Sequence, residues 1–115
     1  MNIIIDDDLE NRHTPKSFTR FTTGFDLLEF MKKNPDILIE NITFDNDLGT
    51  GLPEGYDIVK EMLLDNWHVK NINLHSANTV AVKNMMSYIN SGKKAHVFEY
   101  NSLTQMPLSQ YTTKF

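Results

Sequence analysis

The chain contains no cysteine, so it has neither disulfide bonds nor cysteine-based metal sites. It also lacks any apolar run near the roughly 18 residues that a membrane-spanning helix needs. Its start, "MNIIIDDD", has no basic segment of the kind that opens a signal peptide. These absences predict a cytoplasmic protein with no membrane partner.

Positive charge is scarce as well. The 115 residues include 11 Lys and Arg against 15 Asp and Glu, for a net charge of −4. This balance disfavours a protein that grips a nucleic-acid backbone. A small nucleotide stays open as a ligand, because a metal ion or a few local cations can offset its phosphates. Hydrophobic residues at 40% suffice for a core, and the length favours one domain over residues 1–115.

Apolar patterning predicts strands that alternate with helices, and therefore a parallel sheet built from βαβ units. The polar connection over residues 6–16 has no apolar period and is expected to be a loop, and residues 101–115 are expected to be an irregular tail. A helix after Asn78 or Thr79 is expected to end at Gly92. The other expected elements are strands over 2–5, 18–22, 42–44, 69–74 and 95–100, and helices over 25–33 (capped by Thr23) and 56–66.

Polar clusters follow three of the predicted strands. They are Asp6-Asp7-Asp8, Asp45-Asn46-Asp47 and His75-Ser76-Ala77-Asn78. In open α/β sheets, ligands bind outside the carboxyl ends of the strands, where the strand order reverses. If the three strands are neighbours, the clusters converge on one crevice.

Carboxylates that lie within a few ångströms repel each other unless a cation or a proton intervenes. Hard oxygen ligands suit Mg²⁺, which takes one or two carboxylates together with a substrate phosphate. The two acidic clusters, at residues 6–8 and 45–47, therefore predict a site for Mg²⁺ or Mn²⁺. The competing interpretation is that these aspartates are solvated loop residues or helix caps.

The "HSAN" segment follows an apolar strand and opens a helix. His75 at this position can act as an acid or a base, and the Ser76 hydroxyl with the backbone amides can hold a phosphate. Asn78 is a candidate phosphate ligand or a helix cap. Arg12, in the loop after the first acidic cluster, is a candidate phosphate clamp or a surface ion-pair partner.

These residues resemble a family, the cyclic-phosphate-processing receiver-like domains of bacteria and phages. The segments "FDNDLGTGLPEGYDIVKEML" and "LHSANTVAVKNM" are similar to the family pattern FDHDLG…GYD…HSxN…NM, and "DD" with "RHTP" to its early DD…R.TP. The resemblance covers residues 3–100. It implies a receiver-like (flavodoxin-like) three-layer fold, with a five-stranded parallel sheet in the order 2-1-3-4-5 and truncated helices.

The resemblance implies a pocket for the phosphate of a nucleotide, or of an RNA end that carries a cyclic phosphate, with phosphoesterase activity. Its site residues fall on His75, Asp45 and Asp47 for catalysis and on Ser76, Asn78 and Arg12 for the phosphate. Its metal ligands fall on Asp6, Asp7 and Asp45, with Asp8 as an alternative in register. The resemblance also implies that the cytoplasm is that of a bacterial cell or of a phage-infected host cell. The sequence departs from the pattern in three places: Asn46 replaces a histidine, Ala81-Val82 replaces Gly-Arg, and about two extra residues precede Arg12.

Two alternatives follow from the departures and from the receiver fold. One is a non-catalytic module that binds a nucleotide or a protein partner, such as a phage accessory or counter-defence factor. The other is a phosphoacceptor receiver that is phosphorylated on Asp45. A receiver needs a lysine after its fifth strand, and the strand expected over 95–100 is followed by Asn101-Ser102.

Overall fold

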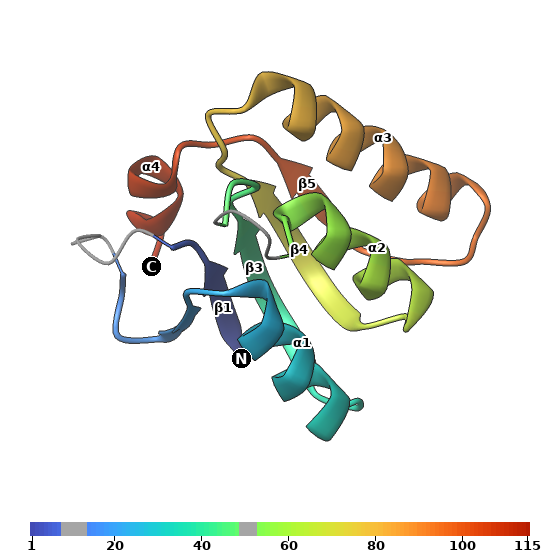
Figure 1. The fold of residues 1–115 in the computed structure, drawn as a ribbon, viewed down its shortest axis with the longest axis horizontal. Helices are drawn as coiled ribbons and strands as arrows, with labels where there is room; N and C mark the ends of the chain where they lie inside the picture. The colour runs from blue at the N-terminus through green and yellow to red at the C-terminus, as the bar shows by residue number, and fades with distance from the viewer. Residues whose placement is uncertain (8–13, 49–52) are drawn as a thin grey trace.

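A computed structural model describes residues 1–7, 14–48 and 53–115 of the chain. Five strands form one sheet in the order β2-β1-β3-β4-β5, and every neighbouring pair is parallel. This confirms the predicted receiver-like topology (Figure 1). In chain order the elements are β1 Asn2–Ile5, β2 Phe18–Phe21, α1 Gly24–Lys33, β3 Leu38–Phe44, α2 Gly55–Leu64, β4 His68–Leu74, α3 Thr79–Lys94, β5 Ser102–Thr104 and α4 Leu108–Thr112.

One face of the sheet carries the main apolar core. Ile3 and Ile5 of β1 point to this face, because alternate residues of a strand face opposite sides. Three helices close over it with the buried side chains of Leu27 and Met31 (α1), Ile58, Val59 and Met62 (α2), and Val82, Met85 and Ile89 (α3). The predicted cap of α1 is confirmed, since Thr23 accepts a hydrogen bond from the Asp26 amide at 3.2 Å.

The opposite face of the sheet is polar over its centre. Parallel register places Asn2, Asn41, Asn71 and Ser102 side by side on four strands. Asn41 donates to Asn2 at 3.0 Å, Asn71 donates to Asn41 at 3.2 Å, and Ser102 donates to Asn71 at 2.8 Å. Because the side-chain amides satisfy one another, this row of the sheet does not require an apolar layer above it.

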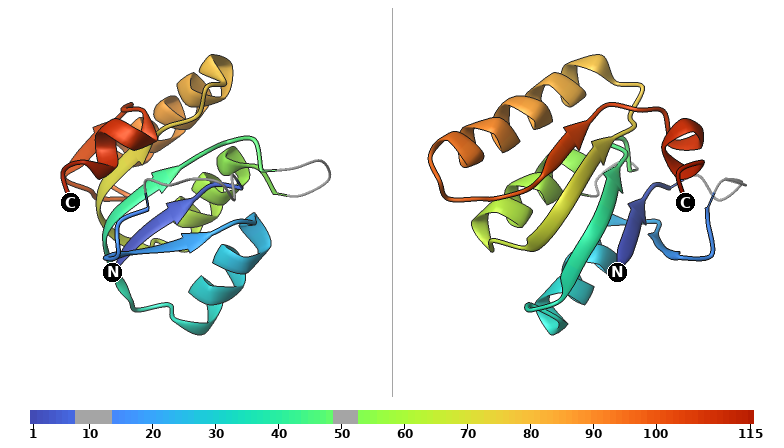
Figure 2. Two further views of the ribbon diagram at one scale, coloured as in Figure 1. Left: turned by 90° about the vertical axis from the view of Figure 1, so that its left-hand side faces the viewer. Right: turned by 180° about the vertical axis from the view of Figure 1, so that it is seen from behind.

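The third layer of the fold is reduced to the short helix α4. Tyr111 packs on Ile4 and Phe18, and the Phe18 ring meets Phe115 edge-on at 4.9 Å. Figure 2 shows α4 and α1 on opposite sides of the sheet. The β1–β2 connection is not helical in its described parts, residues 6–7 and 14–17, as predicted for this loop.

The C-terminal part of the chain corrects three sequence predictions. Residues 95–100 are not a strand, residues 101–115 are not an irregular tail, and Gly92 lies inside α3 instead of ending it. The end of α3 is closed by His96, whose positive φ of 59° lets the chain turn at the end of the helix. Phe98 and Tyr100 are buried two residues apart, which imitates a strand without strand pairing.

The fifth strand and α4 escaped prediction because both are short. β5 has three residues, and α4 has five after Pro107, too few for either periodicity to be visible. Gly92 is explained by helix packing, since a Cβ at this position would lie 2.5 Å from Leu63 Cδ2 of α2.

Asn73 holds the segment after β5 in place. Its buried amide donates to Thr43 Oγ1 and to the Met106 carbonyl, each at 2.9 Å, and accepts from Thr104 Oγ1 at 2.7 Å and from the Met106 amide at 2.8 Å. The side-chain amide thus pairs with the Met106 peptide as a neighbouring strand would, and all of its hydrogen-bonding capacity is used.

We predict that Asn73→Ala destabilises the protein far more than Asn71→Ala. The first change leaves the buried partners of Asn73 unpaired, which costs about 1–3 kcal/mol for each group. Asn71 lies on the same strand and face but bonds at the partly exposed row. Urea unfolding followed by the fluorescence of Trp67 measures both variants. Equal losses would contradict the role assigned to Asn73.

Candidate functional site

The polar clusters meet at the point where the strand order reverses. β1 lies between β2 and β3, so the switch point is flanked by the carboxyl ends of β1 and β3. Asp6 and Asp7 follow β1, Asp45 follows β3, and His75 follows β4, the next strand along the sheet. The three segments therefore reach one edge of the sheet, as the sequence predicted.

Asp6, Asp7 and Asp45 form a cluster that we call the acidic centre. One carboxylate oxygen from each lies within 4.8 Å of the others. Burial is the main cause that raises the pKa of Asp45, and the Asp6 carboxylate adds to the rise. His75, the Asn46 amide and the Ser76 hydroxyl oppose it. The raised pKa means that the ionised form of Asp45 costs free energy in this position.

Asp6 is held by two basic side chains. His75 Nε2 lies 2.9 Å from Asp6 Oδ2, and an Arg20 guanidinium nitrogen from β2 lies 3.6 Å from Asp6 Oδ1. The side chains of Asp6 and His75 are only 10% and 4% exposed. These contacts fix the orientation of the Asp6 carboxylate at the edge of the sheet.

The ring of His75 joins Thr43 to Asp6 in a chain of hydrogen bonds that starts at Asn73. An ionised Asp6 carboxylate can only accept, so in the neutral ring the proton sits on Nε2 and is donated to Asp6. Nδ1 of that tautomer accepts from the Thr43 hydroxyl, at 2.7 Å. Both ring nitrogens of the predicted acid or base are therefore engaged within the fold.

The other predicted site residues support loops around the acidic centre. Ser76 bonds to the Asp45 carboxylate and accepts from the Asn78 amide at 3.1 Å. Asn78 caps α3 by accepting from Ala81 N at 3.0 Å, which confirms its interpretation as a cap, and its side-chain nitrogen lies 3.4 Å from Asp47 Oδ1. Asp47 is exposed and does not belong to the cluster formed by the described residues.

Two of the predicted residues, Arg12 and Asp8, lie outside the described residues. The structure adds Arg20 and Thr43, which the sequence analysis did not select. Each shares a strand face with a site residue, since Arg20 is in register with Ile4 and Thr43 with Asn73. Alternation along each strand gives the face of the sheet on which Arg20 and Thr43 lie, but the register that brings them to Asp6 and His75 is visible only in the structure.

Gly55 sets the distance between α2 and the loop that carries Asp45. A Cβ on Gly55 would lie 2.2 Å from the Asp45 carbonyl oxygen, and the Gly55 amide donates to the Asn46 carbonyl at 2.9 Å. Asn46 is buried and accepts from Tyr56 N at 3.0 Å, so the residue that replaces the family histidine fastens the same loop. Asp57 accepts from Glu54 N at 2.9 Å in a capping box that starts α2.

The acidic centre suits a divalent cation in charge and in spacing. Three carboxylates carry a charge of −3, and the Arg20 guanidinium offsets one unit, which leaves −2. Ligands on opposite sides of such an ion lie about 4–5 Å apart, and all three donors are hard oxygens. Asp6, Asp7 and Asp45 are therefore the residues that could hold a metal ion.

One of three comparisons with known proteins finds a match. A family model described as the cyclic-phosphate processing receiver domain matches residues 1–91, which include β1 to β4 and every residue of the acidic centre. The chain matches no curated protein and no solved structure. Among the described residues, no helix is both long enough and apolar enough to cross a membrane.

We predict that Asp45→Asn raises the melting temperature at neutral pH in metal-free buffer. The folded state holds the Asp45 proton more tightly than the unfolded state, so ionisation of Asp45 lowers stability as the pH rises from 3.8 through the raised pKa. The gain should disappear below pH 3.8, and it should be about 4 °C for each kcal/mol of relief. Melting curves with and without Mg²⁺ measure it.

Mg²⁺ should stabilise the wild type and the control variant Asp36→Asn, but not Asp45→Asn. Asp36 is an exposed aspartate just before the amino end of β3, away from the acidic centre. Equal responses to Mg²⁺ in all three proteins, or a loss of stability in Asp45→Asn, would make Asp45 an ordinary loop residue.

We also predict that Gly55→Ala destabilises the fold by about 1–3 kcal/mol and weakens the response to Mg²⁺, because the new methyl group must displace the Asp45 backbone. Gly92→Ala is the control, since the one close contact of its methyl group, at 2.5 Å, is with the movable end of the Leu63 side chain. Chemical unfolding with and without Mg²⁺ compares them. A Mg²⁺ response in Gly55→Ala as large as that of the wild type would contradict the claim that the close packing of α2 positions the acidic centre.

Proposed function

The chain belongs to the family of cyclic-phosphate processing receiver domains, and we propose that it binds a nucleotide 2′,3′-cyclic phosphate at the acidic centre and hydrolyses it. The observation that carries the proposal is the convergence of Asp6, Asp7 and Asp45 within 4.8 Å. Three carboxylates at a sheet switch point form a site for a phosphate only if a divalent cation offsets their charge.

When bound, the cation supplies charge neutralisation and polarises a phosphate oxygen. The chain then has to hold its own carboxylates in place. His75 and Arg20 fix Asp6, and Ser76 fixes Asp45 through the hydrogen bond to its carboxylate. Ser76, Asn78 and the amides at the start of α3 border the position of the phosphate, and Arg12 is proposed to reach it from the preceding loop.

Hydrolysis adds water across one phosphorus–oxygen bond of the cyclic phosphate. The water oxygen bonds to phosphorus, one ribose oxygen leaves, and the proton lost by water ends on that ribose oxygen. Asp45 and Asp47 are the carboxylates proposed to carry this proton. His75 acts as a positioning residue, because its two ring nitrogens are engaged by Thr43 and Asp6.

The engagement of His75 also favours a second candidate function, binding without turnover. A histidine that is 4% exposed and bonded through both nitrogens exchanges no proton with a ligand unless it leaves a partner. In this case the protein sequesters a cyclic nucleotide, or presents the occupied site to a protein partner.

We predict turnover of adenosine 2′,3′-cyclic phosphate in the presence of Mg²⁺ or Mn²⁺, followed by phosphorus NMR. Asp45→Asn should lower the rate by about 10²-fold or more, because it removes a cation ligand and a proton carrier. Asp36→Asn should match the wild type. His75→Gln, which retains one hydrogen bond, should keep more activity than His75→Ala.

Metal-dependent binding of the nucleotide without turnover would replace hydrolysis with sequestration. If the protein shows no binding and no turnover of the cyclic nucleotide with either metal ion, the phosphate site at the acidic centre is refuted.

A further inference from the structure

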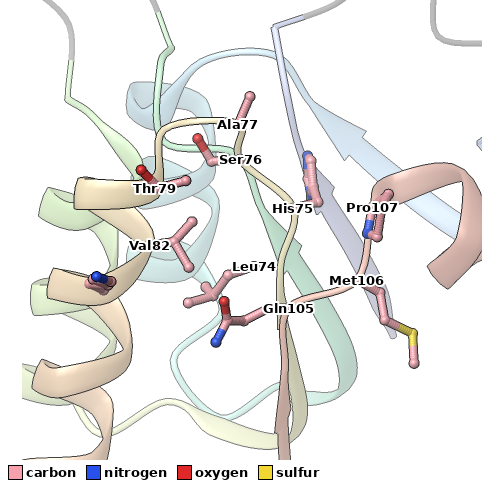
Figure 3. Close-up of a pocket in the computed structure, with 10 residues that line it drawn as sticks. Leu74, His75, Ser76, Ala77, Thr79, Val82, Gln105, Met106 and Pro107 are labelled. Carbon is pink, nitrogen blue, oxygen red and sulfur yellow. The ribbon is translucent and has the colours of Figure 1, made fainter.

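A cavity of about 410 Å³ adjoins the acidic centre, between the start of α3 and the segment that joins β5 to α4. We call it the base cavity. Its volume falls in the range of sites for small ligands, about 300–1,000 Å³. In Figure 3 the side chains of Leu74, Val82 and Gln105 point into the space between these two walls.

Two of the residues that line the base cavity bond directly to the acidic centre. His75 and Ser76 line it, and the same two side chains bond to Asp6 and Asp45. A molecule whose phosphate lies at the acidic centre therefore has the base cavity as the next space along the sheet edge. His75 and Ser76 lie between the base cavity and the acidic centre along this path.

The chemistry of the walls suits a nucleobase and its ribose. Leu74, Val82 and Pro107 supply apolar surface for a flat ring. The Gln105 amide offers one donor group and one acceptor, which are what the polar edge of a base requires. Lys83 adds a positive charge at the wall, which favours an anionic ligand.

A second cavity of about 400 Å³ borders the site on the side of α2 and is less suitable. Glu54 and Asp57 line it, so its walls carry two carboxylates. An anionic nucleotide entering there would approach like charges, whereas the base cavity presents Lys83. The charges of the two cavities therefore favour the base cavity.

We infer that the base cavity receives the nucleobase and ribose of a single nucleotide whose phosphate lies at the acidic centre, an inference that rests on the proposed function. The size of the cavity suits one nucleoside. A strand would need a row of basic residues along its backbone, and Lys83 is the one cation among the described residues that line this cavity. The wall formed by Gln105 and Pro107 lies outside residues 1–91, the part matched by the family model.

Adjacent substitutions at the start of α3 test the inference. Thr79 is exposed and lines the base cavity, and Val80 is exposed and lines the cavity beside α2. Thr79→Trp fills the first space, and Val80→Trp is the matched control that fills the second. Calorimetric titrations with Mg²⁺ compare three probes: adenosine 2′,3′-cyclic phosphate, inorganic phosphate and adenosine.

Thr79→Trp should weaken binding of the cyclic nucleotide by about tenfold or more while the affinity for inorganic phosphate stays within about twofold of the wild type. Val80→Trp should change neither affinity.

The inference is overturned if the wild type binds the cyclic nucleotide no tighter than phosphate, if Val80→Trp is the variant that weakens it, or if Thr79→Trp weakens both ligands equally. If wild type binds neither phosphate nor cyclic nucleotide, the proposed function fails. Binding of adenosine that Thr79→Trp abolishes would then preserve the base cavity as a nucleoside site, and no adenosine binding would reject both.

Discussion

The site depends on a run of hydrogen bonds that crosses the sheet from Asn73 through Thr43 and His75 to Asp6. Asn73 lies on β4, Thr43 on β3, His75 in the loop after β4 and Asp6 in the loop after β1. The hydrogen bonds therefore join these four segments. Asn73 also forms two hydrogen bonds with the backbone of Met106, which hold one wall of the base cavity in place. A single buried network therefore positions the acidic centre and the neighbouring cavity, and such networks specify structure because every member must be satisfied.

The polar face of the sheet explains how a receiver-like sheet is stable with little of a third layer. Where the Asn2, Asn41 and Asn71 side chains satisfy one another, the sheet needs no apolar cover, and α4 is required only over Ile4 and Phe18. The polar rows end in Asp6, Asp45 and His75 at the carboxyl edge. The polar face of the sheet thus continues into the acidic centre, which is its negatively charged end.

Periodicity in the sequence revealed most of the fold. β1 was predicted with its observed bounds, and β2, β4 and α1 to within a few residues, because their apolar positions repeat clearly. β5 was misplaced, since Phe98 and Tyr100 alternate like strand residues but are buried after a turn at His96. The proximity of Asp6, Asp7 and Asp45 was predictable, because the carboxyl ends of neighbouring parallel strands meet at one edge of the sheet. The sequence could not reveal that Arg20 and Thr43 complete the site, because those contacts depend on register between strands far apart in the chain.

The central claim is that Asp6, Asp7 and Asp45 jointly hold a divalent cation, and Mn²⁺ titration followed by amide NMR tests it most directly. A paramagnetic ion broadens signals close to it before all others. The account predicts that the amides of these three residues broaden first, at the lowest Mn²⁺ concentration, with His75 next. Broadening that begins at another acidic pair, such as Glu54 and Asp57 at the start of α2, or that spreads evenly over the acidic surface, would contradict it.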